Sequence, residues 1–294
     1  MADFVSPDSI VRRIWGDGDM VLLVFAGCAA EFALNRAVDW LFFTGNLPND
    51  PIGRLFATAG YAQEIVFADD STASRALERI RSVHLAVERR REQTIPDWAH
   101  RDVLYMLIHY SERAHELLAR ALSPTEQSEL YDVFHRVGAA LQIPDLPPNY
   151  AEWRADRERH LRLDVIRTRC SEALYAAYRR RLGPWRYRLL LHLQSILTPE
   201  HVRDLLQLKC AQWLLHSLRL YPFAIRVRLR SSLQRLLIPG QHLVAVRALD
   251  QRALRGTSGS PPPECHRAPR TRLVAREARR VSLSRSRVRP VARR

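Results

Sequence analysis

Apolar and polar residues alternate with the period of an amphipathic α-helix along most of the first 217 positions of this 294-residue chain. A strand-like alternation occurs in one short run, FAIRVRLR at 223–230, and no unit of fixed length repeats. We therefore expect an all-α fold. The predicted helices cover 8–15, 20–43, 51–67, 72–91, 97–121, 124–141, 149–160, 163–181, 184–195 and 199–217, with a further helix over 223–237.

Three of these helices begin with residues that commonly cap a helix. Ser123-Pro124-Thr125-Glu126 has the spacing of a capping box with proline at the first helical position. Asn149 stands three residues before Glu152, and Thr198 precedes a proline. These side chains satisfy backbone N–H groups that the first turn leaves unpaired, so they fix where the helices begin.

Charge and composition change sharply near the C-terminus. Residues 252–294 hold thirteen arginines and two glutamates, a net charge of +11 out of +15 for the whole chain. The segment is also rich in proline and serine and has little to bury, so we expect a disordered tail after one helical domain over 1–251. It has no interleaved aromatic residues, and we expect a solvated segment without a specific nucleic-acid partner.

The candidate chemistry lies on two neighbouring predicted helices. Arg54 and Thr58 are four residues apart and therefore share a helix face. His84 falls in line with Ile80 and Val87, which places an imidazole on an apolar face. A buried imidazole needs a partner, and a backbone carbonyl is the commonest one. A haem iron is another.

The order of several motifs resembles a known family. The Arg-x-x-x-Thr pair is followed by the Val-His helix, by an aromatic helix carrying His109, and then by SPTEQSELYDVF and IPDLPPNYAEW. Over about residues 10–215 this order resembles the catalytic domain of the rubber oxygenase (latex-clearing protein) family, which includes the MpaB-type oxygenases. The resemblance implies an all-helical fold that encloses one haem b, with His84 as the proximal ligand of the iron.

The same resemblance suggests the roles of the other residues. It implies that Arg54 and Thr58 are catalytic and, together with His109, line the haem pocket. From the residues alone, His109 is equally consistent with a structural hydrogen bond. Arg54 has two alternatives, a bidentate pair with a haem propionate or a buried ion pair with Glu64 or Asp69.

The implied activity is oxidative cleavage of a carbon–carbon double bond in an apolar, isoprenoid-like alkene by O2. The alternative is a non-catalytic helical protein that binds haem or an apolar ligand. Two positions depart from the latex-clearing pattern. Ala57 replaces a lysine that precedes the threonine, and Glu88 replaces an arginine four residues after the histidine. Both departures argue against rubber itself as the substrate.

Other metal and nucleotide chemistries have less support. Glu112 and His115 form a single Glu-x-x-His unit, whereas a di-iron bundle needs two, so we expect both side chains to be exposed. His100 is expected on the surface of a first helical turn. HExxH, P-loop and GxGxxG motifs are absent from the sequence. The four cysteines show no ligand spacing and are expected to be reduced: Cys28, Cys170, Cys210 and Cys265.

The predicted location is cytoplasmic. Residues 24–28 resemble a bacterial lipoprotein box ending at Cys28, but Asp17 and Asp19 adjoin the apolar run, which is short. A lipid anchor on Cys28 and peripheral membrane contact are therefore the alternatives. No apolar segment reaches the ~20 residues of a spanning helix.

Overall fold

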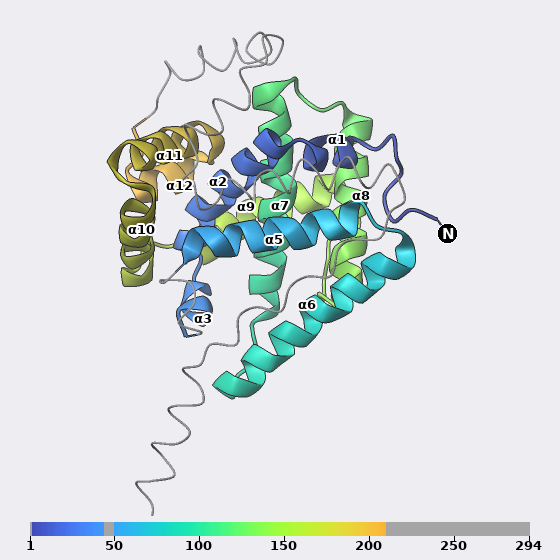
Figure 1. The fold of residues 1–294 in the computed structure, drawn as a ribbon, viewed down its shortest axis with the longest axis horizontal. Coiled ribbons are helices and arrows are strands. Elements are labelled where there is room, and N and C mark those ends of the chain that lie inside the picture. Colours follow the sequence, from blue (N-terminus) through green and yellow to red (C-terminus); the bar gives the residue numbers. More distant parts are fainter. Residues whose placement is uncertain (1, 44–49, 210–294) are drawn as a thin grey trace, which may run out of the picture. The chain divides into compact units, whose positions relative to one another are not determined.

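The described part of the chain is built from α-helices. The structure, a computed structural model, describes residues 2–43 and 50–209, and these contain eleven helices and no strand longer than an isolated bridge. The all-α prediction is therefore confirmed (Figure 1). The helices are α1 Ile10–Gly16, α2 Gly18–Leu34, α3 Val38–Phe43, α5 Pro51–Val66, α6 Asp70–Arg91, α7 Asp97–Leu118, α8 Pro124–Ala140, α9 Tyr150–Asp164, α10 Arg169–Leu182, α11 Pro184–Leu197 and α12 Glu200–Leu206.

Some predictions fall outside the described residues. They are residues 210–217 of the helix at 199–217, the helix at 223–237, the strand at 223–230 and the tail at 252–294. The helix predicted over 199–217 ends early, at Leu206, where Gln207 adopts the left-handed conformation of a C-cap. Within the described residues, two of the three capping predictions hold, and the third is wrong because Thr198 ends α11, its hydroxyl donating to the Gln194 carbonyl, and does not cap α12. Ser123 and Glu126 form a reciprocal capping box at the start of α8, and the Asn149 side chain accepts a hydrogen bond from the Glu152 N–H at 3.0 Å.

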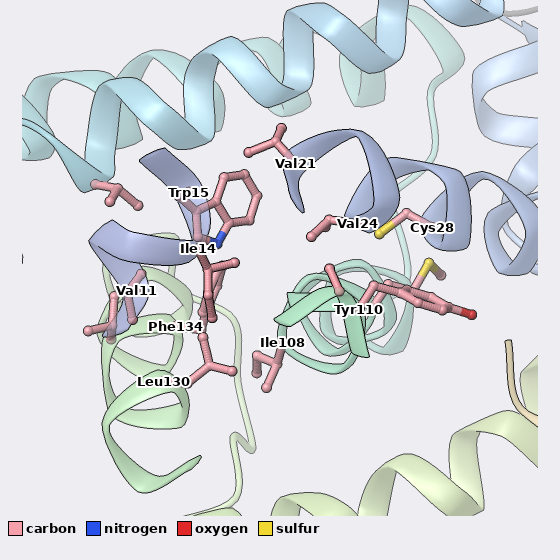
Figure 2. Packing of buried hydrophobic residues seen from close by; sticks show 14 of the residues in the cluster. Val11, Ile14, Trp15, Val21, Val24, Cys28, Ile108, Tyr110, Leu130 and Phe134 are labelled. Atoms are coloured by element: carbon pink, nitrogen blue, oxygen red, sulfur yellow. The ribbon is translucent and has the colours of Figure 1, made fainter. Parts of the chain in front are cut away.

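Helices α2 and α7 form the centre of the packing. A Cβ placed on Gly27 of α2 would lie 2.2 Å from a ring carbon of Tyr110 on α7, so the absence of a side chain lets the two helices approach closely. Around this contact, a buried cluster joins α1, α2, α7 and α8, with Trp15 and Phe134 among its largest members (Figure 2). The two rings lie 5.9 Å apart.

A buried ion pair links α2 to α9. The Arg157 guanidinium donates two hydrogen bonds to the Glu31 carboxylate, at 3.0 and 2.7 Å, and the Tyr110 hydroxyl donates a third at 2.8 Å. The Glu31 and Arg157 side chains are 2% and 5% exposed. Deeply buried charges are costly unless they are paired. Each side chain therefore supplies the opposite charge that the other needs in the core.

Two other predicted helix ends are displaced in the structure, and the two lie side by side at the bridge between Asn35 and Val165. The predicted helix at 20–43 is broken at Asn35, whose side-chain oxygen accepts from the Ala37 N–H at 2.8 Å. The sequence predicts that one helix ends at residue 160 and the next begins at 163. In the structure α9 continues to Asp164, and the following residue, Val165, forms an antiparallel bridge with Asn35. The Asn35 side chain competes with the helical backbone for the Ala37 N–H, which favours the end of α2 at this point. The bridge between Asn35 and Val165 then fixes the ends of α2 and α9 together.

Helix α6 lies in the core only near its start. Helices α5 and α6 meet at the turn around residue 68 and diverge from it (Figure 1). Ala73, Ala76 and Leu77 are buried, whereas Val83 and Leu85 are 57% and 41% exposed. The prediction that His84 lies on a core-facing stripe is therefore only partly right, because the second half of α6 leaves the core and His84 is partly buried.

Two observations bear on membrane association. Among the described residues, no helix combines the length and the apolar character needed to cross a membrane. Cys28, the residue that a lipoprotein box would modify, is 7% exposed and lies within α2.

Candidate functional site

Three helices bring a guanidinium and two imidazoles together. Arg54 lies in the first turn of α5, His84 in the exposed half of α6 and His100 in the first turn of α7. The two imidazole rings lie 4.9 Å apart, tilted by 39°. His100 is therefore not the surface residue expected from its place in a first turn, because it is partly buried against His84.

The surroundings keep the His84 imidazole uncharged at neutral pH. Burial, followed by the positive charges of His100 and Arg54, lowers the pKa of His84 to about 4. Burial also lowers the pKa of His100, against the opposing effects of Glu88 and Asp97. A neutral imidazole has a free lone pair, which is the form that coordinates a metal.

Arg54 has neither of the carboxylate partners considered from the sequence. Glu64 pairs with Arg79, and Asp69 caps α6 by accepting from the Thr72 N–H at 2.9 Å. The two ion-pair alternatives for Arg54 are therefore wrong. Within residues 2–43 and 50–209 the Arg54 guanidinium makes no ion pair, and burial lowers the pKa of Arg54. A partly buried guanidinium in this state is suited to a ligand carboxylate.

Thr58 lies one turn after Arg54 and is exposed. Its hydroxyl donates to the Arg54 carbonyl at 3.1 Å, which leaves the oxygen lone pairs free to accept. Ala57 is also exposed, and Tyr61, one turn further, is 45% exposed. The face of α5 that carries Arg54 is thus open along two turns.

His109 is not brought together with Arg54 and His84. It lies nine residues after His100 on α7, a separation of about 14 Å along the helix axis. Its ring packs edge-on against Tyr110, and the charges closest to it belong to Arg157, Arg113 and Arg154. Burial, followed by these charges, lowers the pKa of His109, and its Nε2 has no hydrogen-bond partner in the described part of the chain.

The structure also gives structural roles to Glu88, which departs from the latex-clearing pattern, and to His115. Glu88 accepts from the Ile95 N–H at 2.8 Å, so it holds the connection between α6 and α7 near His100. His115, which we expected to be exposed, is 6% exposed, and its Nδ1 lies 2.8 Å from the Arg120 carbonyl. The hydrogen bond to the carbonyl gives it a structural role in ending α7.

A second cluster was missed entirely by the sequence reasoning. Asp102 of α7 meets His160 and Asp164 of α9, and all three are buried. The local signal was the spacing Asp156, His160, Asp164, which places three ionisable groups on one face of α9. The Asp102 contact depends on helix packing and has no local signal.

Comparison with known proteins identifies the family. The profile of the family described as ER-bound oxygenase mpaB/B'/rubber oxygenase, catalytic domain, matches residues 12–229. The chain therefore belongs to this family of oxygenase catalytic domains. Comparisons with curated proteins and with solved structures gave no match.

The residues around Arg54 fit a haem. The neutral imidazole of His84 on α6 would be available to bind a haem iron, and the Arg54 guanidinium on α5, which has no ion pair in the described residues, would be available to bind a propionate. The exposed side chains of Tyr61 and Val83, on the same two helices, offer apolar contact to a hydrophobic macrocycle. The residues therefore match a haem in the ligand atoms that they offer and in their charge.

Proposed function

We propose that the chain is a haem b-dependent oxygenase that cleaves a carbon–carbon double bond of an apolar, isoprenoid-like substrate with O2. The observation that carries the proposal is the meeting of uncharged His84 with Arg54, which has no ion-pair partner among the described residues, in a chain of an oxygenase family. An imidazole ligand and a guanidinium are what a haem needs at its iron and at its propionates.

Each residue has a defined part in this proposal. His84 would bind the haem iron through the lone pair of its neutral imidazole, and the ring of His100, 4.9 Å away, restricts rotation of the His84 ring. Arg54 would bind a haem propionate and so orient the haem relative to α5. The Thr58 hydroxyl donates to the Arg54 carbonyl, so its oxygen would be free to accept a hydrogen bond from the substrate, and the exposed side chains of Tyr61 and Val83 would contact hydrocarbon.

The reaction balances without an outside reductant. Cleavage of an alkene by one O2 breaks the double bond and the O–O bond and forms two carbonyl groups, so each product keeps one oxygen atom. The haem supplies the position at which dioxygen is activated. The chain binds the alkene beside that position and keeps the site apolar.

Isotope labelling tests this function. The purified chain should carry one haem b, measured by its visible spectrum and iron content. Supplied with squalene as the alkene and ¹⁸O₂, it should form two carbonyl products that each contain one ¹⁸O by mass spectrometry. A protein without haem would refute the haem proposal. A haem protein that consumes no oxygen with alkenes would instead be the non-catalytic binder.

Ala57 gives a further prediction about access to the iron. Without a lysine at this exposed position, we expect imidazole and carbon monoxide to bind the iron without displacing a protein group. Ala57→Lys should slow that binding about tenfold or more, because an amine one residue before Thr58 would compete for the open position. Stopped-flow spectra of the two proteins measure this.

The matched control for that prediction is Ala57→Gln, which adds length without an amine. It should bind both ligands at close to the wild-type rate. A wild-type spectrum that is already six-coordinate with a nitrogen donor, and resists added ligands, would contradict the open position.

A further inference from the structure

A buried Asp-His-Asp cluster lies away from the Arg54 site. His160 and Asp164, four residues apart, share a face of α9, and Asp102 approaches them from α7. His160 Nδ1 lies 3.1 Å from Asp102 Oδ1 and 2.9 Å from Asp164 Oδ2. The three side chains are 7%, 4% and 11% exposed, in the order His160, Asp102, Asp164.

The central nitrogen of this cluster faces two carboxylates. His160 Nδ1 lies within ion-pair distance of both Asp102 and Asp164, yet neither contact with these described residues has the geometry of a good hydrogen bond. A buried polar nitrogen of this kind requires an explanation, and an ion held among the three groups is one. The nitrogen is more than nine-tenths buried and aimed into the cluster.

The spacing suits a metal ion. Bonds of about 2.1 Å at right angles or at the tetrahedral angle separate neighbouring ligand atoms by about 3.0–3.4 Å. The two measured separations from Nδ1 lie within about 0.1 Å of the right-angle value, and the three candidate ligand atoms all lie within 4.8 Å of one another. One imidazole and two carboxylates form a mixed nitrogen and oxygen set that suits Mn²⁺, Fe²⁺ or Zn²⁺.

Each candidate ligand is already oriented by a second group. Asn35 donates to the other oxygen of Asp102 at 2.6 Å, and Arg36 lies 3.8 Å from the other oxygen of Asp164. Asp156 faces His160 Nε2 at 3.6 Å and accepts from the Tyr105 hydroxyl at 2.7 Å. A carboxylate behind the far nitrogen of a histidine is the arrangement that orients metal-binding imidazoles.

The local charge also favours a divalent cation. Asp102, Asp156 and Asp164 surround one imidazole. Arg159 pairs with Asp156, Arg36 lies 3.8 Å from Asp164, and the buried Arg157 is occupied by Glu31, so within the described residues Asp102 has no arginine partner. Buried carboxylates need compensating positive charge. A single proton on His160 supplies one unit of positive charge between the Asp102 and Asp164 carboxylates, whereas a divalent ion supplies two units.

We propose that Asp102, His160 and Asp164 bind one divalent transition-metal ion at the junction of α7, α9 and the end of α2. The ion would tie together the two helix ends at Asn35 and Val165, which already pair in a bridge. The site is separate from the haem proposal, since none of its residues contacts Arg54 or His84 in the described part of the chain.

Manganese binding tests the proposal directly. The purified full chain is stripped with EDTA and titrated with Mn²⁺, while electron paramagnetic resonance measures the free ion. We expect one saturable site per chain. Asp164→Asn and His160→Gln should each weaken binding at least about a hundredfold, since loss of an orienting partner alone costs 10–100-fold. Asp145→Asn, the same change at an exposed residue, should bind as the wild type does.

Two results would overturn the site. One is the absence of saturable binding to the wild-type chain, and the other is unchanged binding by both folded ligand variants. If the variants fail to fold, ring-nitrogen NMR of wild-type His160 decides, with Zn²⁺ as the diamagnetic probe. Zinc should remove the proton from Nδ1. A His160 that keeps protons on both ring nitrogens in excess zinc holds a proton in place of a metal.

Discussion

Replacing His84 by alanine is expected to abolish haem binding while leaving the fold intact. His84 is the histidine whose imidazole is held uncharged beside Arg54, so its loss removes the proposed iron ligand. The fold should survive, because the surrounding half of α6 packs little and Val83 next to it is 57% exposed. We expect the Soret band and the iron content to fall to near zero and the far-ultraviolet circular dichroism to be unchanged.

The matched control is His201→Ala, which removes an exposed histidine in the first turn of α12. It should keep full haem occupancy. Added imidazole gives a second check, because it should restore a Soret band to the His84→Ala protein by entering the space of the lost side chain. Full haem occupancy in His84→Ala with an unchanged spectrum would show that another residue binds the iron.

Much of the fold was predictable because its signals are local. The capping box at Ser123 and the apolar period of α7 act within one or two turns, so sequence alone places these helices. The ends at Asn35 and Asp164 were misplaced because each is fixed by a partner more than a hundred residues away. The residues of one segment carry no information about a partner that is so distant in the sequence.

In the candidate site, too, features set within one helix were predictable, and contacts between helices were not. The spacing of Arg54 and Thr58 on one face follows from helix geometry and was predicted. The contact between His84 and His100 needed the turn from α6 to α7, held by Glu88, and was missed. His109 was grouped with these residues through the family resemblance, yet its place on α7 sets it beside Arg157.

The largest stability effect is expected at the buried pair of Glu31 and Arg157. Arg157→Leu leaves the Glu31 carboxylate in the core with the Tyr110 hydroxyl as its one hydrogen-bond partner among the described residues. An uncompensated buried charge costs about 3–5 kcal/mol, so the free energy of unfolding should fall by about that amount. Urea unfolding followed by circular dichroism measures this loss.

A double variant separates the cost of a stranded charge from the value of the pair. Arg157→Leu/Glu31→Leu removes both charges, and it should be more stable than Arg157→Leu alone, because apolar side chains replace a buried ion pair at little cost. The control is Arg79→Leu, which breaks the exposed pair with Glu64 and should cost less than about 1 kcal/mol. If Arg157→Leu and Arg79→Leu destabilise the protein equally, the Glu31 charge is not stranded in the core, and α2 is held mainly by its close contact with α7 at Gly27 and Tyr110.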